Sequence, residues 1–482
     1  MPQPSPSSKP RAVCFWLVVT VIGLALRVAM VPLGPRYGYM ADHDDFVRWG
    51  IQATDHGLLT LYDHPPPRRD LRTWTNGQWT IAQRDFDRVC NYPPLSAYLL
   101  YGSGLLFKGV SSDRLINTTV SRAVFESWSI LADFFLAWGC ASLVARLRSG
   151  RAGRWTYLLV LLAPPLWWDS AAWGQMDSPI LATLVWMVRA MIDSRWWMAG
   201  ALFGLAAGLK PQAVLLLPLW ALAVVGTRPR IKPLLALVLA GAVLLLMALP
   251  FTVHSGLAWW HNSYVANLTT AYGEATTLMA CNIWYIDLLA TGSADATRRW
   301  LGVTRDVWGK VFLLAGLAGG FALAAWRWRC RPESYVLLCA LTLLVCVMLP
   351  TRVHERYLLL ALPWLVMAAV MWRRFWAPAL MLTAVATFQV TWPLWLHATP
   401  DWEGIERQAA AQYDAILATA TPEQKARALP LAKAIAPLRQ QYLTARGKTV
   451  CYEWLFTLLA LTGTALTVTA AAVSPTGRSP PT

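Results

Sequence analysis

Long apolar runs recur along this 482-residue chain, and they constrain its fold more than any other feature. Runs of roughly 17 to 25 apolar residues have the length that a helix needs to cross a bilayer. Hydrophobic residues make up 56% of the chain and charged residues only 14%, which is too apolar for an ordinary soluble enzyme of this length. The sequence therefore predicts an all-α, polytopic membrane protein.

The basic residues indicate how the chain is threaded. The net charge of +16 is spread over short loops between the apolar runs, as the positive-inside rule predicts, so we expect no nucleic-acid partner. Placing these loops inside gives about twelve transmembrane helices, both termini inside and one outer face shared by the polar clusters. The expected spans are residues 13–33, 122–145, 155–172, 178–193, 196–210, 212–226, 233–252, 307–326, 334–350, 357–371, 375–394 and 452–473.

Four segments follow from this topology. Residues 1–10 form a Pro/Ser-rich leader that we expect to be disordered and cytoplasmic. Residues 11–394 form the transmembrane module, including a first outer loop at residues 34–121 with a short interfacial or re-entrant helix near residues 95–107. Residues 395–450 are expected to be amphipathic helices on the outer face. Residues 451–482 contain the last transmembrane helix and a cytoplasmic tail.

The cluster His354-Glu355-Arg356 interrupts two apolar runs, where ionisable groups are costly unless they serve a site. An arginine presents a fork of donors that matches phosphate oxygens, and a histidine adds another donor. With Arg352 nearby, the cluster fits a lipid-linked phosphate at the membrane surface. A simpler interpretation is that Glu355 and Arg356 pair with each other.

The first outer loop opens with three aspartates, Asp42, Asp44 and Asp45. Carboxylates this close raise one another's pKa, which suits one of them to act as a general base toward an acceptor hydroxyl. The alternative is a hydrated acidic turn in which Asp44 or Asp45 caps a helix.

Two further clusters complete the candidate site. Gln175 and Asp177 lie at one bend between spans and suit a sugar hydroxyl or a neighbouring cation, although Asp177 also fits a helix start. Lys210, followed closely by Gln212, falls at an outer helix end against the positive-inside bias. We therefore expect Lys210 to pair with a counter-ion, either an aspartate of the other clusters or a phosphate.

Together these motifs resemble the GT-C class of integral-membrane glycosyltransferases. The resemblance is closest to bacterial mannosyltransferases related to the second GPI-anchor mannosyltransferase of eukaryotes. It rests on Asp42, Phe46 and Trp49, on Tyr92-Pro93-Pro94-Leu95, on Trp173-Gly174-Gln175-Met176-Asp177-Ser178, on Lys210-Pro211-Gln212, on Asn282-Ile283-Trp284 and on His354-Glu355-Arg356-Tyr357.

The resemblance implies a donor sugar on a polyprenyl phosphate and an aspartate of the first outer loop as the catalytic base. The spacing to Phe46 and Trp49 favours Asp42 over Asp44, while Asp44, Asp45, Gln175, Asp177, Lys210, Gln212, His354, Glu355 and Arg356 are expected to bind substrate. We expect neither a metal nor a cofactor, because cationic side chains already face the phosphate.

The sequence thus predicts a hexosyltransferase, with mannose the first choice of sugar. It would invert the anomeric carbon and act on a glycan or lipid acceptor at the outer, periplasmic face of the plasma (inner) membrane, among membrane lipids. The alternative is a transporter or flippase for a lipid-linked or anionic solute, whose ionisable residues should lie near the bilayer midplane.

Overall fold

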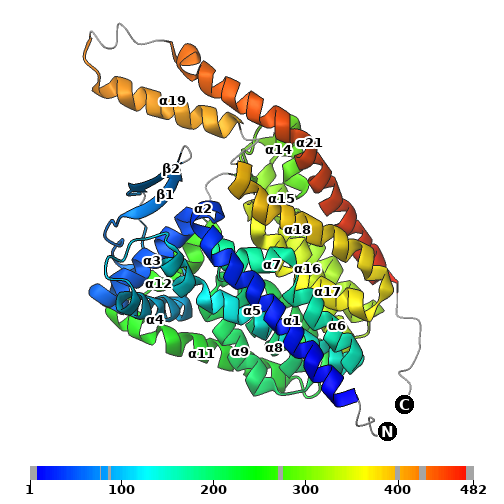
Figure 1. Ribbon diagram of the computed structural model, residues 1–482. Helices are drawn as coiled ribbons and strands as arrows, with labels where there is room; N and C mark the ends of the chain where they lie inside the picture. Colours follow the sequence, from blue (N-terminus) through cyan, green and yellow to red (C-terminus); the bar gives the residue numbers. More distant parts are fainter. Residues whose placement is uncertain are drawn as a thin grey trace.

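The computed structural model describes residues 8–75, 78–84, 88–269, 275–396, 402–422 and 430–473. Helices form most of it (Figure 1), so the expected all-α, polytopic architecture is confirmed. Residues 1–7 of the expected leader and 474–482 of the expected tail lie outside the described residues, as do 397–401 and 423–429 of the outer segment.

The helices are distributed over the whole chain. They are α1 Ser8–Met30, α2 Gly34–Tyr37, α3 Met40–Asp55, α4 Pro94–Val110, α5 Thr119–Leu147, α6 Gly150–Leu161, α7 Pro164–Trp168, α8 Asp177–Ile192, α9 Trp196–Leu209, α10 Leu217–Gly226, α11 Ile231–Ser255, α12 Ala258–Trp260, α13 Ala266–Thr269, α14 Ile283–Thr291, α15 Arg305–Ala322, α16 Pro332–Met348, α17 Leu362–Met371, α18 Trp376–Leu396, α19 Trp402–Thr419 and α21 Leu431–Ala472.

Five helical segments among the described residues are long and apolar enough to cross a membrane unaided. They are Val13–Tyr37, Thr119–Leu147, Ile231–Ser255, Arg305–Arg327 and Thr449–Ala472. Every expected span contains a helix, but several are shorter or interrupted, so the count of twelve stays a prediction. The expected span at 155–172 is broken after Leu161, because the following pair Pro164-Pro165 cannot continue the backbone hydrogen bonds of α6.

Among the described residues, three short two-stranded sheets lie in the loops. The hairpin of β1 (Leu71–Thr75) and β2 (Gln78–Ala82) projects from the first outer loop, as Figure 1 shows. β3 (Thr277–Leu278) pairs in parallel with β6 (Val353–His354), and β4 (Arg299–Trp300) pairs with β5 (Val303–Thr304). The β3–β6 pair matters most, because it ties the segment after α16 to a distant outer loop.

The first outer loop packs on the helical body through α3 and α4. Gly50 allows α3 to approach the body, since a Cβ on Gly50 would lie 2.6 Å from a side chain of α5, and Gly104 allows α4 to approach α3, since a Cβ there would lie 2.2 Å from the Gly50 carbonyl oxygen. Phe46 and Trp49 of α3 are buried, and moving a phenylalanine side chain out of water contributes about 1.5–3 kcal/mol. This packing fixes the start of α3, and therefore Asp42, against the membrane helices.

The C-terminal part forms an extended arm in Figure 1, where α19 and the upper half of α21 project beyond the other helices. α21 is continuous from Leu431 to Ala472, so the last apolar segment and the preceding polar segment share one helix across residue 450. The expected short helix in the first outer loop corresponds to α4.

Candidate functional site

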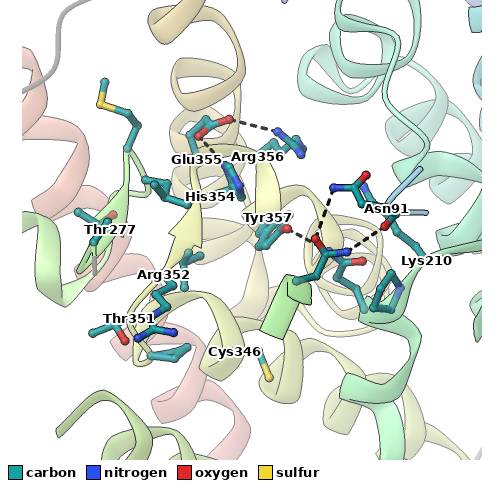
Figure 2. Close-up of a pocket in the computed structure, with 18 of the residues that line it drawn as sticks. Asn91, Lys210, Thr277, Cys346, Thr351, Arg352, His354, Glu355, Arg356 and Tyr357 are labelled. Carbon is teal, nitrogen blue, oxygen red and sulfur yellow. Dashed lines mark hydrogen bonds and ion pairs between the residues drawn. The ribbon is translucent and has the colours of Figure 1, made fainter. Parts of the chain in front are cut away.

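A cavity of about 1110 Å³ opens where the first outer loop meets the segments before α10 and after α16. Six of its described lining residues are arginine or lysine and three are aspartate or glutamate, so it favours an anion. Figure 2 shows the cluster after β6 on one wall, with Asn91 and Lys210 close together on another. Six of the ten residues selected from the sequence line the cavity: Asp42, Lys210, Gln212, His354, Glu355 and Arg356.

Asp42 lies in the first turn of α3, with its carboxylate facing the cavity. Trp173 donates its indole N–H to Oδ2 at 3.2 Å, and the Gln175 amide donates to the same oxygen. Arg356 Nη1 lies 3.7 Å from Oδ2, and Arg88 Nη2 lies 3.9 Å from Oδ1. Donors on Oδ2 orient the carboxylate and leave Oδ1 less occupied, which is the arrangement a general base needs.

Asp44 and Asp45 are buried and do not line the cavity. Asp44 faces Arg48 at 3.6 Å and Arg84 at 3.3 Å, and Asp45 is 2.6 Å from Arg88. Neither caps a helix, because α3 begins at Met40. Their expected direct contact with substrate has no support in this cavity lining. The helical step of 100° per residue turns Asp44 away from Asp42, whereas Asp45 lies on the same side of α3 as Asp42 but is buried beneath Arg84 and Arg88. Both carboxylates instead form ion pairs with Arg84 or Arg88, which line the cavity.

Burial raises the pKa of the Asp44 carboxyl to about 6, although Arg48 and Arg84 act in the opposite direction. The sequence interpretation gave this role to neighbouring carboxylates, but Asp45 makes only a smaller contribution. For Arg88, burial lowers the pKa, and Asp45 and Asp42 more than compensate, so its pKa is raised overall and it stays cationic.

The raised pKa predicts a pH-dependent stability. Because the folded-state pKa of Asp44 is about 6 against an ordinary 3.8, the associated stabilisation is complete below the lower value and lost as the pH rises through the higher. The apparent Tm of the wild type should therefore fall relative to that of Asp44→Asn between about pH 4.5 and pH 7. Thermal unfolding in detergent measures this, and parallel curves for the two proteins would exclude it.

The bend between α7 and α8 packs against the Asp42 carboxylate. Gly174 has φ +82°, and a Cβ there would lie 2.8 Å from Glu126, so a glycine is required at this turn. Gln175 is buried, and Tyr92 donates its hydroxyl to Gln175 Oε1 at 3.3 Å. Asp177 does not cap α8, which begins at Asp177 itself; its carboxylate instead lies 2.5 Å from Lys210 Nζ. The expected pairing of Lys210 with an aspartate is thus present in the structure.

The cluster after β6 presents a buried guanidinium. Arg356 is 7% exposed and faces three carboxylates at 3.5–3.8 Å, on Asp42, Asp177 and Glu355. Its Nε has no hydrogen-bond partner among the described residues. The guanidinium carbon also lies 5.4 Å from the centre of the Trp173 ring. Pairing with Glu355 alone does not describe this arginine, because it also lies near two other carboxylates and stacks on Trp173. Since all of these ion pairs are long, the guanidinium can still bind a phosphate.

Several lining residues were missed by the sequence interpretation. Arg84 and Arg88 come from the loop after β2, and Tyr39, Asn91 and Asn267 also line the cavity. No spacing pattern connects these positions to Asp42, so only a polar composition near residues 84–91 could have drawn attention to them. Within the described parts of the chain, no group of three His, Cys, Asp or Glu side chains is arranged to hold a metal ion.

Arg122 of α5 connects the bend before α8 to the segment before α3 through hydrogen bonds. It is fully buried and donates to the carbonyls of Ala172 at 3.0 Å and Trp173 at 3.2 Å. It also donates to Asn117, whose amide donates to the Pro35 carbonyl at 3.0 Å. One guanidinium thus fixes both segments that set the position of the Asp42 carboxylate.

Arg122→Lys is therefore expected to lower kcat by about a hundredfold, because small displacements of a catalytic group cost that much. The KM for the donor should change by less than about threefold, since Arg122 does not line the cavity. Arg305→Lys is a matched control, because Arg305 is also buried and donates to the Asp295 carbonyl and to Asp287, but in another loop. Equal losses of kcat in both variants would contradict the positioning role.

Comparisons with known proteins give a family and distant structural similarities. The model of glycosyltransferase family 87 matches residues 91–350, which is more than half of the chain. The fold is similar to ArnT from Cupriavidus metallidurans in the apo state, with a TM-score of 0.44 and 14% identity over 96% of this chain and 78% of that one. It is also similar to the apo oligosaccharyltransferase of Archaeoglobus fulgidus, with a TM-score of 0.39 and 13% identity over 96% of this chain and 56% of that one. No curated protein matches the sequence.

Proposed function

The chain belongs to glycosyltransferase family 87, and from this premise we propose that it transfers a hexose from a polyprenyl phosphate to an acceptor hydroxyl, with mannose the first choice of sugar. The observation that carries the proposal is the juxtaposition of Asp42 and Arg356 in one cationic cavity. A carboxylate and a buried arginine fork beside one another at the edge of the cavity provide a base for the acceptor and a partner for the leaving phosphate.

The proposed reaction is a single displacement. Asp42 removes the proton of the acceptor hydroxyl as that oxygen attacks the anomeric carbon. The bond from this carbon to the phosphate oxygen breaks, its electron pair passes to the phosphate, and the anomeric configuration inverts. Arg356 and His354 then stabilise the charge that grows on the phosphate. Lys210 acts on the phosphate through its electrostatic field and not by direct contact, because it already forms an ion pair with Asp177.

An apolar part of the cavity suits the lipid portion of the donor. Val214 and Leu215 before α10, Leu313 of α15 and Cys346 of α16 contribute to the lining. A polyprenyl chain buries such surface favourably, whereas a sugar nucleotide has no apolar chain to place there. An apolar part beside a cationic part of the same cavity therefore favours a lipid-linked phosphate as the donor.

The outer face is the proposed location of the reaction. Asp177 and the cavity residue Lys210 lie at one end of α8 and α9, and the basic residues Arg189 and Arg195 lie at or near the other end. Since basic loops face the cytoplasm, the cavity faces the periplasmic side of the inner membrane. A lipid or glycan exposed there is the proposed acceptor.

Cys346→Trp tests whether the apolar part of the cavity binds the lipid of the donor. An indole at this position fills apolar space, so kcat/KM with a long-chain polyprenyl-phosphate hexose should fall by about tenfold or more. With a donor of only two or three isoprene units the loss should be much smaller, because that chain does not reach the blocked part. Equal losses with long and short donors would place the lipid elsewhere. Cys339→Trp does not serve as a control because Cys339 is buried in the core, whereas the exposed Cys14→Trp does.

A further inference from the structure

Two amide oxygens in the cavity are not used by the proposed reaction. Asn91 and Gln212 both line the cavity, and Asn91 Oδ1 and Gln212 Oε1 are buried with no hydrogen-bond partner among the described residues. A buried acceptor without a donor is unfavourable, so such groups in a binding cavity are commonly satisfied by a ligand. Two of them facing the same space require a ligand that carries several hydrogen-bond donors.

The rest of each amide is fixed, which makes the two oxygens a rigid pair. Gln212 donates its amide N–H to the Tyr357 hydroxyl at 3.0 Å. The Asn91 amide N–H points to Asn267 Oδ1 at 3.5 Å, and Asn267 donates to the Asn91 backbone carbonyl at 2.9 Å. Because one N–H of each amide is engaged, the orientation of the amide is set and its oxygen is left for a ligand.

The two amides belong to segments that connect Asp42 with the apolar part of the cavity. Tyr92, next to Asn91, contacts Gln175, which in turn donates to Asp42. Lys210 Nζ lies 5.9 Å from the centre of the Tyr92 ring, and Gln212 follows it by two residues and precedes the apolar Val214 and Leu215. A group placed between the base and the lipid chain is the hexose of the donor itself.

We propose that Asn91 and Gln212 form a subsite that accepts hydrogen bonds from hydroxyls of the donor hexose and so determines which sugar is transferred. Aromatic rings of Tyr92 and Tyr357 beside the amides suit the apolar face of a sugar ring. The cavity lining carries more cationic than acidic side chains, which disfavours an amino sugar, because its ammonium group would be repelled. The ligand class is therefore a neutral hexose, and this inference rests on the proposed function for the identity of the donor.

Deoxy donors test the subsite. The panel contains the polyprenyl-phosphate hexose that the wild type uses best and analogues that each lack one hydroxyl. Gln212→Met and Asn91→Leu remove one acceptor each at nearly constant volume. Each variant should lose about tenfold to a hundredfold in kcat/KM with the parent hexose and show no further loss with the one analogue that lacks its hydroxyl. Gln389→Met is the matched control, because Gln389 Oε1 is also buried without a partner but lies on α18 outside the cavity.

A uniform loss across the parent and every analogue would overturn the subsite, since a purely structural effect does not distinguish hydroxyls. Equilibrium binding of the same panel is measured in parallel. A wild type that binds these donors and transfers none of them overturns the proposed function, and the pattern of dissociation constants still decides the subsite. Binding that is equal for parent and deoxy donors in the wild type overturns the subsite alone.

Discussion

Replacing Asp42 with asparagine is expected to lower the transfer rate by about a thousandfold, which corresponds to about 4 kcal/mol in the barrier. Asparagine keeps the size of the side chain and can still contact Trp173 and Gln175, but it cannot accept the proton of the acceptor hydroxyl. The donor should therefore bind with nearly unchanged affinity. Initial rates with saturating labelled donor, together with the dissociation constant of the donor, measure both quantities.

Asp44→Asn is the control for this substitution. It lies on the same helix and removes the same charge, but its carboxylate faces Arg48 and Arg84 and does not line the cavity. Its transfer rate should stay within about threefold of the wild type if the enzyme is folded. A large loss in Asp44→Asn combined with a small loss in Asp42→Asn would move the base to Asp44.

The second large effect is expected at Arg356. Arg356→Gln should lower kcat by about a hundredfold to a thousandfold, because in the proposed reaction the guanidinium stabilises the charge that develops on the leaving phosphate. Arg356→Lys should recover part of the loss, since it restores the charge without the planar fork. Single-turnover transfer measures the chemical step directly.

Arg374→Gln is the matched control for Arg356. Arg374 also stacks on aromatic rings, with its guanidinium carbon 5.7 Å from the centres of the Trp328 and Phe375 rings, but it does not line the cavity. Its loss should leave the transfer rate within about threefold. If the two variants behave alike, Arg356 has a structural role and the phosphate lies elsewhere.

The membrane architecture follows directly from the sequence because its cause is local. A helix in lipid depends on a run of apolar residues, and basic loops mark its orientation. The match to glycosyltransferase family 87 confirms the predicted resemblance at the level of a glycosyltransferase. The relation to mannosyltransferases in particular stays a prediction.

The candidate site was predictable where each residue belongs to a compact motif. Asp42, Lys210 and Arg356 were selected from short clusters, and the structure brings all three to one cavity. The functions of these residues remain predictions. Asp44 and Asp45 show the limit of this reasoning, because adjacency in sequence does not reveal which carboxylates are buried against arginines from another segment.

Other contacts depend on tertiary packing that no short motif encodes. Arg88 reaches Asp45 and Asp42 from a loop more than forty residues away in the chain. The β1–β2 hairpin was missed because its residues sit in a polar segment without a clear alternation of apolar residues. Arg122 lies at the start of the expected span 122–145, and its hydrogen bonds to the bend before α8 are visible only in the folded structure.

The most direct test of the account is a transfer assay with purified protein. Radiolabelled polyprenyl-phosphate mannose or polyprenyl-phosphate glucose is supplied, in separate reactions, with membranes of the native host as the source of acceptor. The account predicts that label from one donor appears in a new product, with an equal amount of polyprenyl phosphate released and the anomeric configuration inverted. An intact donor after incubation with folded protein, or donor that only crosses the bilayer unchanged, would contradict it and favour a transporter.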